Sequence, residues 1–182
     1  MSNFFESNQK EYLLWDLLGN IEQGRQNLGS KVPVFIYRLF EYSLKEELTK
    51  QFGSEQAAEL FRNAGERAGK EFAKNMLDLT LPMPQFFEHL QTTLSQYEMG
   101  ILRCEQFDAE SGTIILTISE DLDCSGLPII GDTVCHYDEG LLKGILTCYT
   151  KHNYCVREID CWATGSRVCR FEAKVLNESR ES

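Results

Sequence analysis

The chain has 182 residues, a formal net charge of −10 and a hydrophobic fraction of 42%, which exclude wholesale disorder and allow one domain with a buried core. The excess of 28 acidic over 18 basic residues argues against nucleic acid as a partner, because phosphate binding needs a basic surface. No apolar run approaches the roughly 20 residues that span a bilayer, and the amino terminus lacks the pattern of a signal peptide. We therefore expect a cytoplasmic protein without a transmembrane segment, in which thiols stay reduced.

The first half of the sequence has the periodicity of helices. One helix is predicted over 33–52, because Pro33 suits a first helical position. A second, capped by Ser54, is predicted to reach residue 77. Prolines at positions 82 and 84 then interrupt the chain, and a shorter helix is expected over 85–97. Residues 1–30 are interpreted as an amino-terminal helical extension.

The period changes to two after residue 99. Residues 113–119 alternate as a half-buried strand, and residues 99–107 are its expected antiparallel partner. A helix over 132–150 precedes two predicted strands, over 154–162 and 167–175. This order predicts an α+β fold, in which amino-terminal helices pack on an antiparallel sheet that ends in a helix and a hairpin. The main domain is then 31–176, and 177–182 is a polar tail.

Four side chains in the last third of the chain are candidate metal ligands: Cys135, Glu158, Cys161 and Cys169. A hairpin that turns at Gly165 sets Cys161 opposite Cys169, with β-carbons about 4.5–5.5 Å apart. That separation lets both thiolates bind one tetrahedral ion at a Zn–S distance of about 2.3 Å. A regular strand sends residues 158 and 161 to opposite faces, so Glu158 can join them only with a bulge or an early strand end. Such a set leaves no open position, which is typical of structural zinc.

Spacing alone leaves two other interpretations of these cysteines open. Cys161 and Cys169 could form a cross-strand disulfide, or the cysteines could be inert core residues. The short Cys-x-x-Cys spacing of many zinc sites is absent. None of the three histidines has a catalytic role in this interpretation, and four cysteines have no assigned role: Cys104, Cys124, Cys148 and Cys155.

Two segments resemble the signature of the 4-vinyl reductase-like domain family: CHYDEGLLKGIL at 135–146 and VREIDCWATGSRVCRF at 156–171. The resemblance extends to VPVFIYRL at 32–39 and AGERAG at 64–69. In the family's sensor domains, which are attached to phenol-responsive activators, zinc is held by Cys, Glu, Cys and Cys. The resemblance therefore implies zinc as the cofactor, with the four candidate ligands above. It also implies an α+β fold related to small subunits of vesicle-tethering complexes and to haem nitric-oxide-binding domains.

The same resemblance implies a pocket between the helices and the sheet for a small hydrophobic ligand, whether lipid-, aromatic- or tetrapyrrole-like. Aromatic residues at helical spacing more often form core than line a pocket. Gly65 and Gly69 each cost a helix about 1 kcal/mol relative to Ala, which predicts close helix packing or a ligand near the backbone. The candidate pocket residues are Phe35, Phe40, Phe61, Gly65, Gly69, Phe72, Tyr97 and Tyr149.

The predicted function is non-enzymatic binding of that ligand, because no nucleotide-binding loop or nucleophile motif is present. One alternative is an assembly or scaffolding factor that acts as a homodimer, for instance for photosynthetic pigment-protein complexes. A large exposed apolar patch would favour this alternative. Another alternative is a subunit of a tetrapyrrole vinyl reductase, which would need a hydride source for which the sequence has no signature.

Overall fold

The computed structural model describes residues 14–108 and 110–176, which belong to two compact units, one up to Val32 and one from Pro33. Helix in the described part of the first unit is limited to a 3-10 turn, Asp16–Leu18, and the single-turn α1, Ile21–Gly24. Gly19 has a φ of 63°, a conformation that ends a helix. The first 13 residues of the predicted extension and the predicted tail, 177–182, lie outside the described residues.

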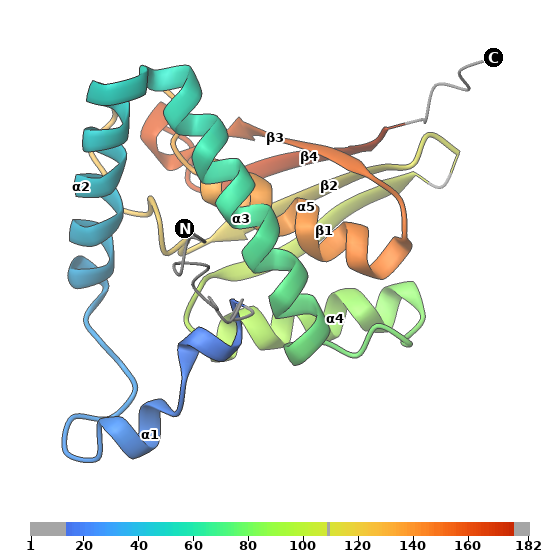
Figure 1. Cartoon of the computed structure of the whole chain (residues 1–182). Helices are drawn as coiled ribbons and strands as arrows, with labels where there is room; N and C mark the ends of the chain where they lie inside the picture. The colour runs from blue at the N-terminus through green and yellow to red at the C-terminus, as the bar shows by residue number, and fades with distance from the viewer. Residues whose placement is uncertain (1–13, 109, 177–182) are drawn as a thin grey trace, which may run out of the picture. The chain divides into compact units, whose positions relative to one another are not determined.

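Three helices open the second unit (Figure 1): α2 (Val34–Phe52), α3 (Ser54–Met76) and α4 (Met83–Gln96). They agree with the predicted helices to within a few residues. In α3, every fourth residue from Ala57 to Ala73 is buried, so the helix presents one narrow face to its neighbours. None of the described helices is both long enough and apolar enough to cross a bilayer.

The four strands are β1 (Ile101–Asp108), β2 (Thr113–Ser119), β3 (Tyr154–Asp160) and β4 (Cys169–Val175). They form one antiparallel sheet in the order β1-β2-β4-β3. The alternation predicted for residues 113–119 is observed, because Ile114, Leu116 and Ile118 are buried on the inner face of the sheet. The predicted α+β fold is confirmed.

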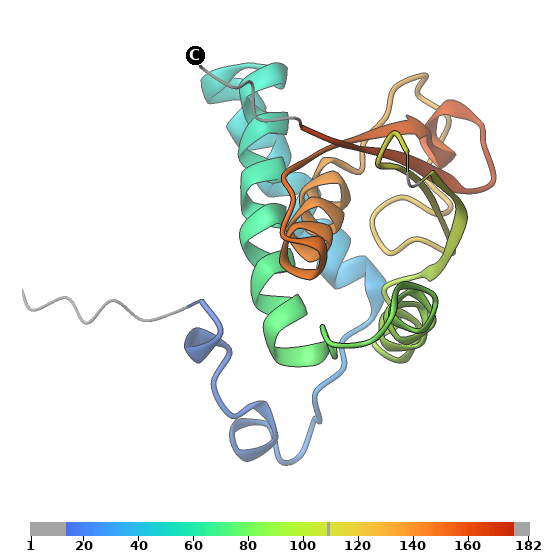
Figure 2. The same ribbon diagram turned by 90° about the vertical axis from the view of Figure 1, so that its right-hand side faces the viewer.

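Helix α5 (His136–Thr150) lies between the sheet and α3, as Figures 1 and 2 show from two sides. Its Leu142, Ile145 and Leu146 are fully buried, as are Leu116 and Phe171 of the sheet. The helix begins at His136 rather than at the predicted residue 132, because Cys135 has a non-helical backbone. The core therefore lies between α5 and the sheet, and α4 packs against β1.

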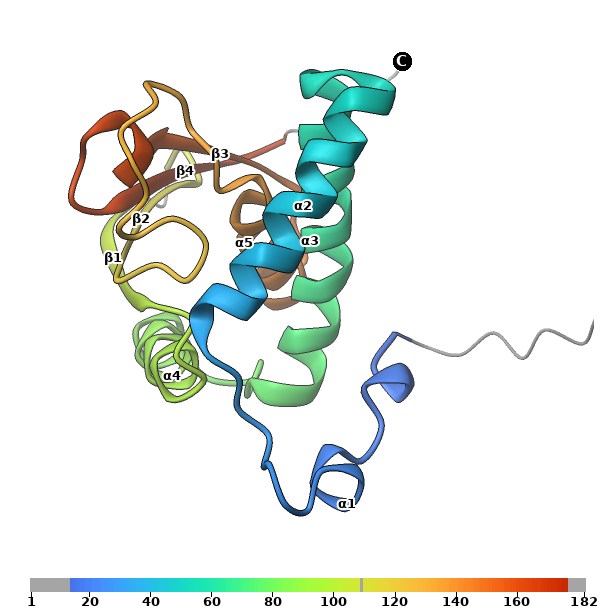
Figure 3. The same ribbon diagram turned by 90° about the vertical axis from the view of Figure 1, so that its left-hand side faces the viewer.

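Helices α3 and α5 pack backbone to backbone through four glycines, at the crossing visible in Figure 3. A β-carbon on Gly65 would lie 2.1 Å from the carbonyl oxygen of Tyr137, and one on Gly69 would lie 2.1 Å from that of Leu141. The same holds from the other side, where Gly140 and Gly144 of α5 face backbone atoms of α3. Gly65 and Gly69 thus serve helix packing, which was one of the two roles predicted for them.

Candidate metal centre and ligand cavities

Four buried cysteines from four segments meet at one end of the sheet. Cys124 lies in the loop after β2, Cys135 precedes α5, Cys161 follows β3 and Cys169 opens β4. Their exposed fractions are 0 or 1%. The sulfur of Cys135 is 3.9 Å from that of Cys161 and 3.7 Å from that of Cys169, and the Cys124 and Cys169 sulfurs are 3.0 Å apart. All four sulfurs lie within 4.8 Å of one another.

This arrangement suits one tetrahedral metal ion. Sulfurs at about 2.3 Å from a tetrahedral zinc lie about 3.8 Å from one another, which the two Cys135 distances match closely. Each of the seven cysteines is free, and even the shortest of these S···S distances exceeds the roughly 2.05 Å of a disulfide. Four soft sulfur donors with no room for a fifth ligand are the chemistry of a structural zinc site.

The thiols also perturb one another electrostatically. Hydrogen bonds from the other three thiols lower the pKa of Cys161, whereas the pKa of Cys135 and Cys169 is raised. The group thus favours one thiolate over several when no cation is bound, because charges that close repel. A divalent cation would reverse that preference by stabilising every thiolate.

Glu158 lies beside this group because β3 is irregular there. The register of β3 against β4 shifts between Glu158 and Asp160, which is the bulge that the sequence required. Its Oε2 accepts a hydrogen bond of 3.1 Å from the backbone N–H of Cys135, and its Oε1 is buried without a partner. Burial and the Cys161 thiol raise the pKa of Glu158 to about 8. A buried carboxyl with a free oxygen next to a thiol fits a place in or next to a metal site.

Glu139 of α5 supports this arrangement from behind. Its Oε1 accepts a hydrogen bond of 2.8 Å from the backbone N–H of Glu158, and its Oε2 pairs with the guanidinium of Arg62 on α3. Burial opposes ionisation of Glu139, but hydrogen bonds from His136, Glu158 and Arg62 lower its pKa below the ordinary value. The charged pair therefore ties α3 and α5 to the strand that carries Glu158.

Sequence reasoning missed Cys124. The structure brings Cys135, Cys161 and Cys169 together with Cys124, which had no predicted role, and places Glu158 at the edge of the group. Cys124 lies in an irregular loop held by Asp121, whose Oδ1 accepts hydrogen bonds from the backbone N–H groups of Asp123 and Cys124. No periodicity places such a loop, so the only signal in the sequence was an unassigned cysteine.

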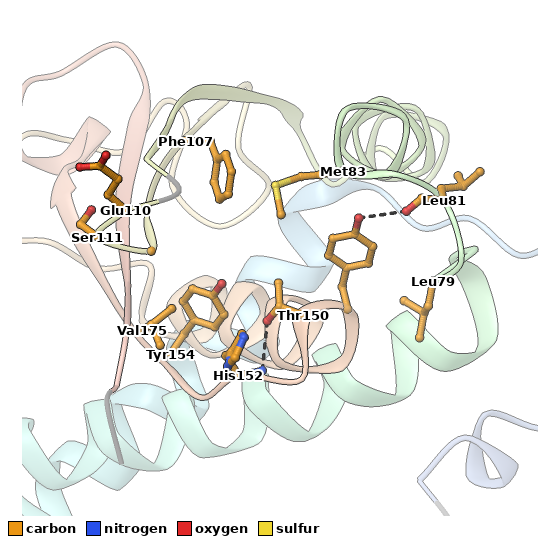
Figure 4. A pocket seen from close by; sticks show the side chains of 12 residues that line it. Leu79, Leu81, Met83, Phe107, Glu110, Ser111, Thr150, His152, Tyr154 and Val175 are labelled. Carbon is orange, nitrogen blue, oxygen red and sulfur yellow. Dashed lines mark hydrogen bonds between the residues drawn. The ribbon is translucent and has the colours of Figure 1, made fainter. Parts of the chain in front are cut away.

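Two cavities could accept a small molecule. The larger, of about 610 Å³, opens between the start of α4, the β1–β2 hairpin and the end of α5 (Figure 4). Its polar groups are partly satisfied internally, since the Tyr149 hydroxyl donates to the Leu81 carbonyl at 2.9 Å and Thr150 Oγ1 accepts from the His152 N–H at 3.2 Å.

The smaller cavity, of about 390 Å³, lies between α2 and α3. One carboxyl group, that of Glu41, reaches an otherwise apolar and aromatic lining. Glu41 is 6% exposed, and its Oε2 has no hydrogen-bond partner. The lining consists of Tyr37, Phe40, Glu41, Leu44, Leu48, Leu60, Phe61, Ala64, Met99, Leu122 and Tyr137.

The predicted pocket residues are distributed over several places. Phe40 and Phe61 line the smaller cavity, and Tyr149 lines the larger. Phe72 and Tyr97 line neither and pack edge to face with ring centroids 6.3 Å apart. Phe35 is 66% exposed on α2, and the two glycines lie in the helix crossing.

Comparison with known protein families matches residues 114–175 to the 4-vinyl reductase (4VR) domain. The chain carries a 4VR domain. The match covers the strands and α5 that supply all four cysteines, and it confirms the resemblance seen in the sequence. The protein MJ1642 of Methanocaldococcus jannaschii is 27% identical to this 4VR chain over 156 residues, which are 85% of each chain.

Solved structures share the fold. A vinyl-4-reductase family protein of M. jannaschii superposes with a TM-score of 0.59 at 19% identity, over 92% of this chain and 98% of that one. The phenol-responsive sensory domain of the transcription activator PoxR, solved with phenol, gives 0.56 at 19% identity over 76% and 74%. Trafficking protein particle complex subunit 3 of Naegleria fowleri, covalently bound to palmitic acid, gives 0.62 at 9% identity over 81% and 98%. An H-NOX protein of S. oneidensis gives 0.51 at 13% over 78% and 74%, so both expected fold relationships are confirmed.

Proposed function

We propose that this 4VR chain is a binding module for a small hydrophobic molecule, which occupies the cavity between α2 and α3, and that a structural zinc stabilises its carboxy-terminal half. The observation that carries the proposal is the cavity of about 390 Å³ with its almost entirely apolar lining. Sites for small molecules typically have that size and character. Proteins of the same fold solved with phenol and with covalently bound palmitic acid support the same class of ligand.

The experiment is a titration with ethylbenzene, followed through the ¹³C-methyl signals of Leu44 and Leu60, which line the cavity. Saturable shifts confined to cavity residues are expected. The variant Ala64→Phe fills the cavity from an exposed helix position and should abolish the shifts. Arg67→Phe adds the same ring at an exposed position of α3 that does not line the cavity and should leave binding intact. Shifts that survive Ala64→Phe would place the ligand elsewhere.

The zinc ligands in this proposal are Cys135, Cys161 and Cys169 with one further side chain. Glu158 is the fourth ligand expected from the family, and Cys124 is the alternative that the sulfur positions favour. Cobalt substitution separates them, because thiolate-to-cobalt absorption scales with the number of bound thiolates. Loss of about a quarter of that absorption in Cys124→Ser, with none in Glu158→Gln, would assign Cys124; the reverse effect on metal affinity would assign Glu158.

Assembly through the surface is a second candidate, and the outer face of α2 favours it. Val34, Phe35, Ile36, Leu39 and Phe40 are each 43–68% exposed, and contiguous apolar surface of this kind often marks an interface. A homodimer would cover this face. Light scattering should then give twice the chain mass for the wild type and a monomer for Phe35→Ser with Leu39→Ser. A monomeric wild type would remove this candidate.

A further inference from the structure

The region where α2 meets the loop after β2 contains more buried negative charge than its neighbours balance. Glu41, Asp121, Asp123 and Asp138 are each no more than 7% exposed. No ion pair joins any of them to a basic side chain in the described part of the chain. Buried charges are ordinarily paired with an opposite charge or with a metal, so this group lacks a partner.

The nearby basic side chains point their donors elsewhere. Arg38 donates to the carbonyl oxygen of Leu122 at 2.7 Å and to that of Asp121 at 3.3 Å, and Lys45 donates to the carbonyl oxygen of Val134 at 2.9 Å. Among the polar contacts of the four carboxyls, the Tyr37 hydroxyl donates to Asp123 at 2.9 Å. One oxygen each of Glu41, Asp121 and Asp123 has no partner at all.

Glu41 connects this charge to the cavity between α2 and α3. It is the one carboxyl side chain in the cavity lining, and its unpartnered oxygen is buried there. Burial and the neighbouring charge of Asp123 raise its pKa to about 8, which is the response of a carboxyl without a cationic partner. The cavity wall also presents the aromatic rings of Tyr37, Phe40, Phe61 and Tyr137, and aromatic faces attract organic cations.

Resting on the function proposed above, we propose that the ligand of this cavity is an apolar amine, bound as the ammonium ion with its charge against the Glu41 carboxylate and its hydrocarbon part among the aromatic and aliphatic side chains. A neutral hydrocarbon would leave the Glu41 oxygen unsatisfied, and an anion would be repelled by all four carboxyls. An ammonium group supplies the hydrogen bonds and the positive charge that Glu41 lacks. The cavity itself accommodates the apolar part.

Three probes of nearly equal size separate the terms: phenethylamine, 2-phenylethanol and ethylbenzene, each titrated calorimetrically into the full chain. We expect the amine to bind at least tenfold more tightly than the alcohol, and ethylbenzene to bind most weakly. In Glu41→Gln, which keeps the side-chain shape, the advantage of the amine should disappear while the alcohol still binds. Glu47→Gln, at an exposed position of the same helix, should leave the order unchanged.

Other results would overturn the proposal. Equal affinity for amine and alcohol, or an amine preference that persists in Glu41→Gln, would remove the role of Glu41 but leave the cavity as a hydrophobic site. Tight, Glu41-dependent binding of Mn²⁺ or Ca²⁺ alone would show that the carboxyls serve a metal ion, for which Asp121, Asp138 and Cys135 already lie within 4.8 Å of one another. Failure of all three probes to bind would overturn the binding function as well.

Discussion

Replacing Gly140 by alanine tests how closely α3 and α5 must approach. A β-carbon at this position would lie 2.0 Å from the carbonyl oxygen of Arg62, 2.7 Å from the backbone nitrogen of Glu66 and 2.8 Å from the carbonyl carbon of Arg62. All three obstacles are backbone atoms of α3, so no side-chain rotation relieves the overlap. The helices would have to move apart by roughly 1 Å in a core packed at crystal-like density.

Two opposing terms set the magnitude. Overpacking a close-fitting core costs about 1–3 kcal/mol and occasionally more, and a rigid backbone obstacle belongs at the upper end. Alanine returns about 1 kcal/mol of helix propensity relative to glycine. We expect a net loss of about 2–3 kcal/mol in the free energy of unfolding, because separation also weakens the three other glycine contacts. For a domain of this size that corresponds to a fall in Tm of roughly 4–12 °C.

Urea unfolding followed by circular dichroism measures this loss. Gly24→Ala is the control, because a β-carbon at Gly24 would have no heavy atom within 4 Å; its free energy of unfolding should stay within about 0.5 kcal/mol of the wild-type value. A Gly140→Ala chain as stable as the wild type would refute the close crossing of α3 and α5.

Three further predictions concern the metal, the buried ion pair and pH. Removal of zinc by a chelator should lower the free energy of unfolding by about 4 kcal/mol, the linkage expected when zinc is present at a thousand times its Kd, and re-added zinc should restore the Tm in a thermal scan; an unchanged Tm in protein shown to be metal-free would contradict a structural zinc. Arg62→Met should cost about 3 kcal/mol in urea unfolding because it leaves the buried Glu139 carboxylate unpaired, whereas Arg67→Met at an exposed position should cost almost nothing. The pKa of Glu41 rises from 4.5 to about 8 on folding, so the folded chain retains a proton that the unfolded chain releases, and stability should fall as pH rises from about 4.5 to about 8; Glu41→Gln should flatten this slope, and an identical pH profile in the variant would argue against the buried, unpaired carboxyl.

Much of the fold was predictable because its elements have strong local signals. The helices over 33–52 and 54–77 combine clear periodicity with a proline start and a serine cap, and the strand over 113–119 alternates regularly. The bulge in β3 was also foreseeable, because a regular strand cannot direct residues 158 and 161 to the same side. The close pair Gly65 and Gly69 pointed to tight packing, since glycine in a helix interior otherwise only costs stability.

The sequence by itself determined the α+β class, the three cysteines that flank the last hairpin and α5, and the presence of Glu158 beside them. Only the tertiary structure brought Cys124 into that group, because its loop has no periodicity and reaches the site through long-range contacts. The cavity between α2 and α3 was equally invisible, since a helical pattern shows which residues are apolar but not which partner surface covers them. Phe72 and Phe40 follow the same sequence rule, yet one packs against Tyr97 and the other lines the cavity, because the angle and separation of the helices decide what each side chain meets.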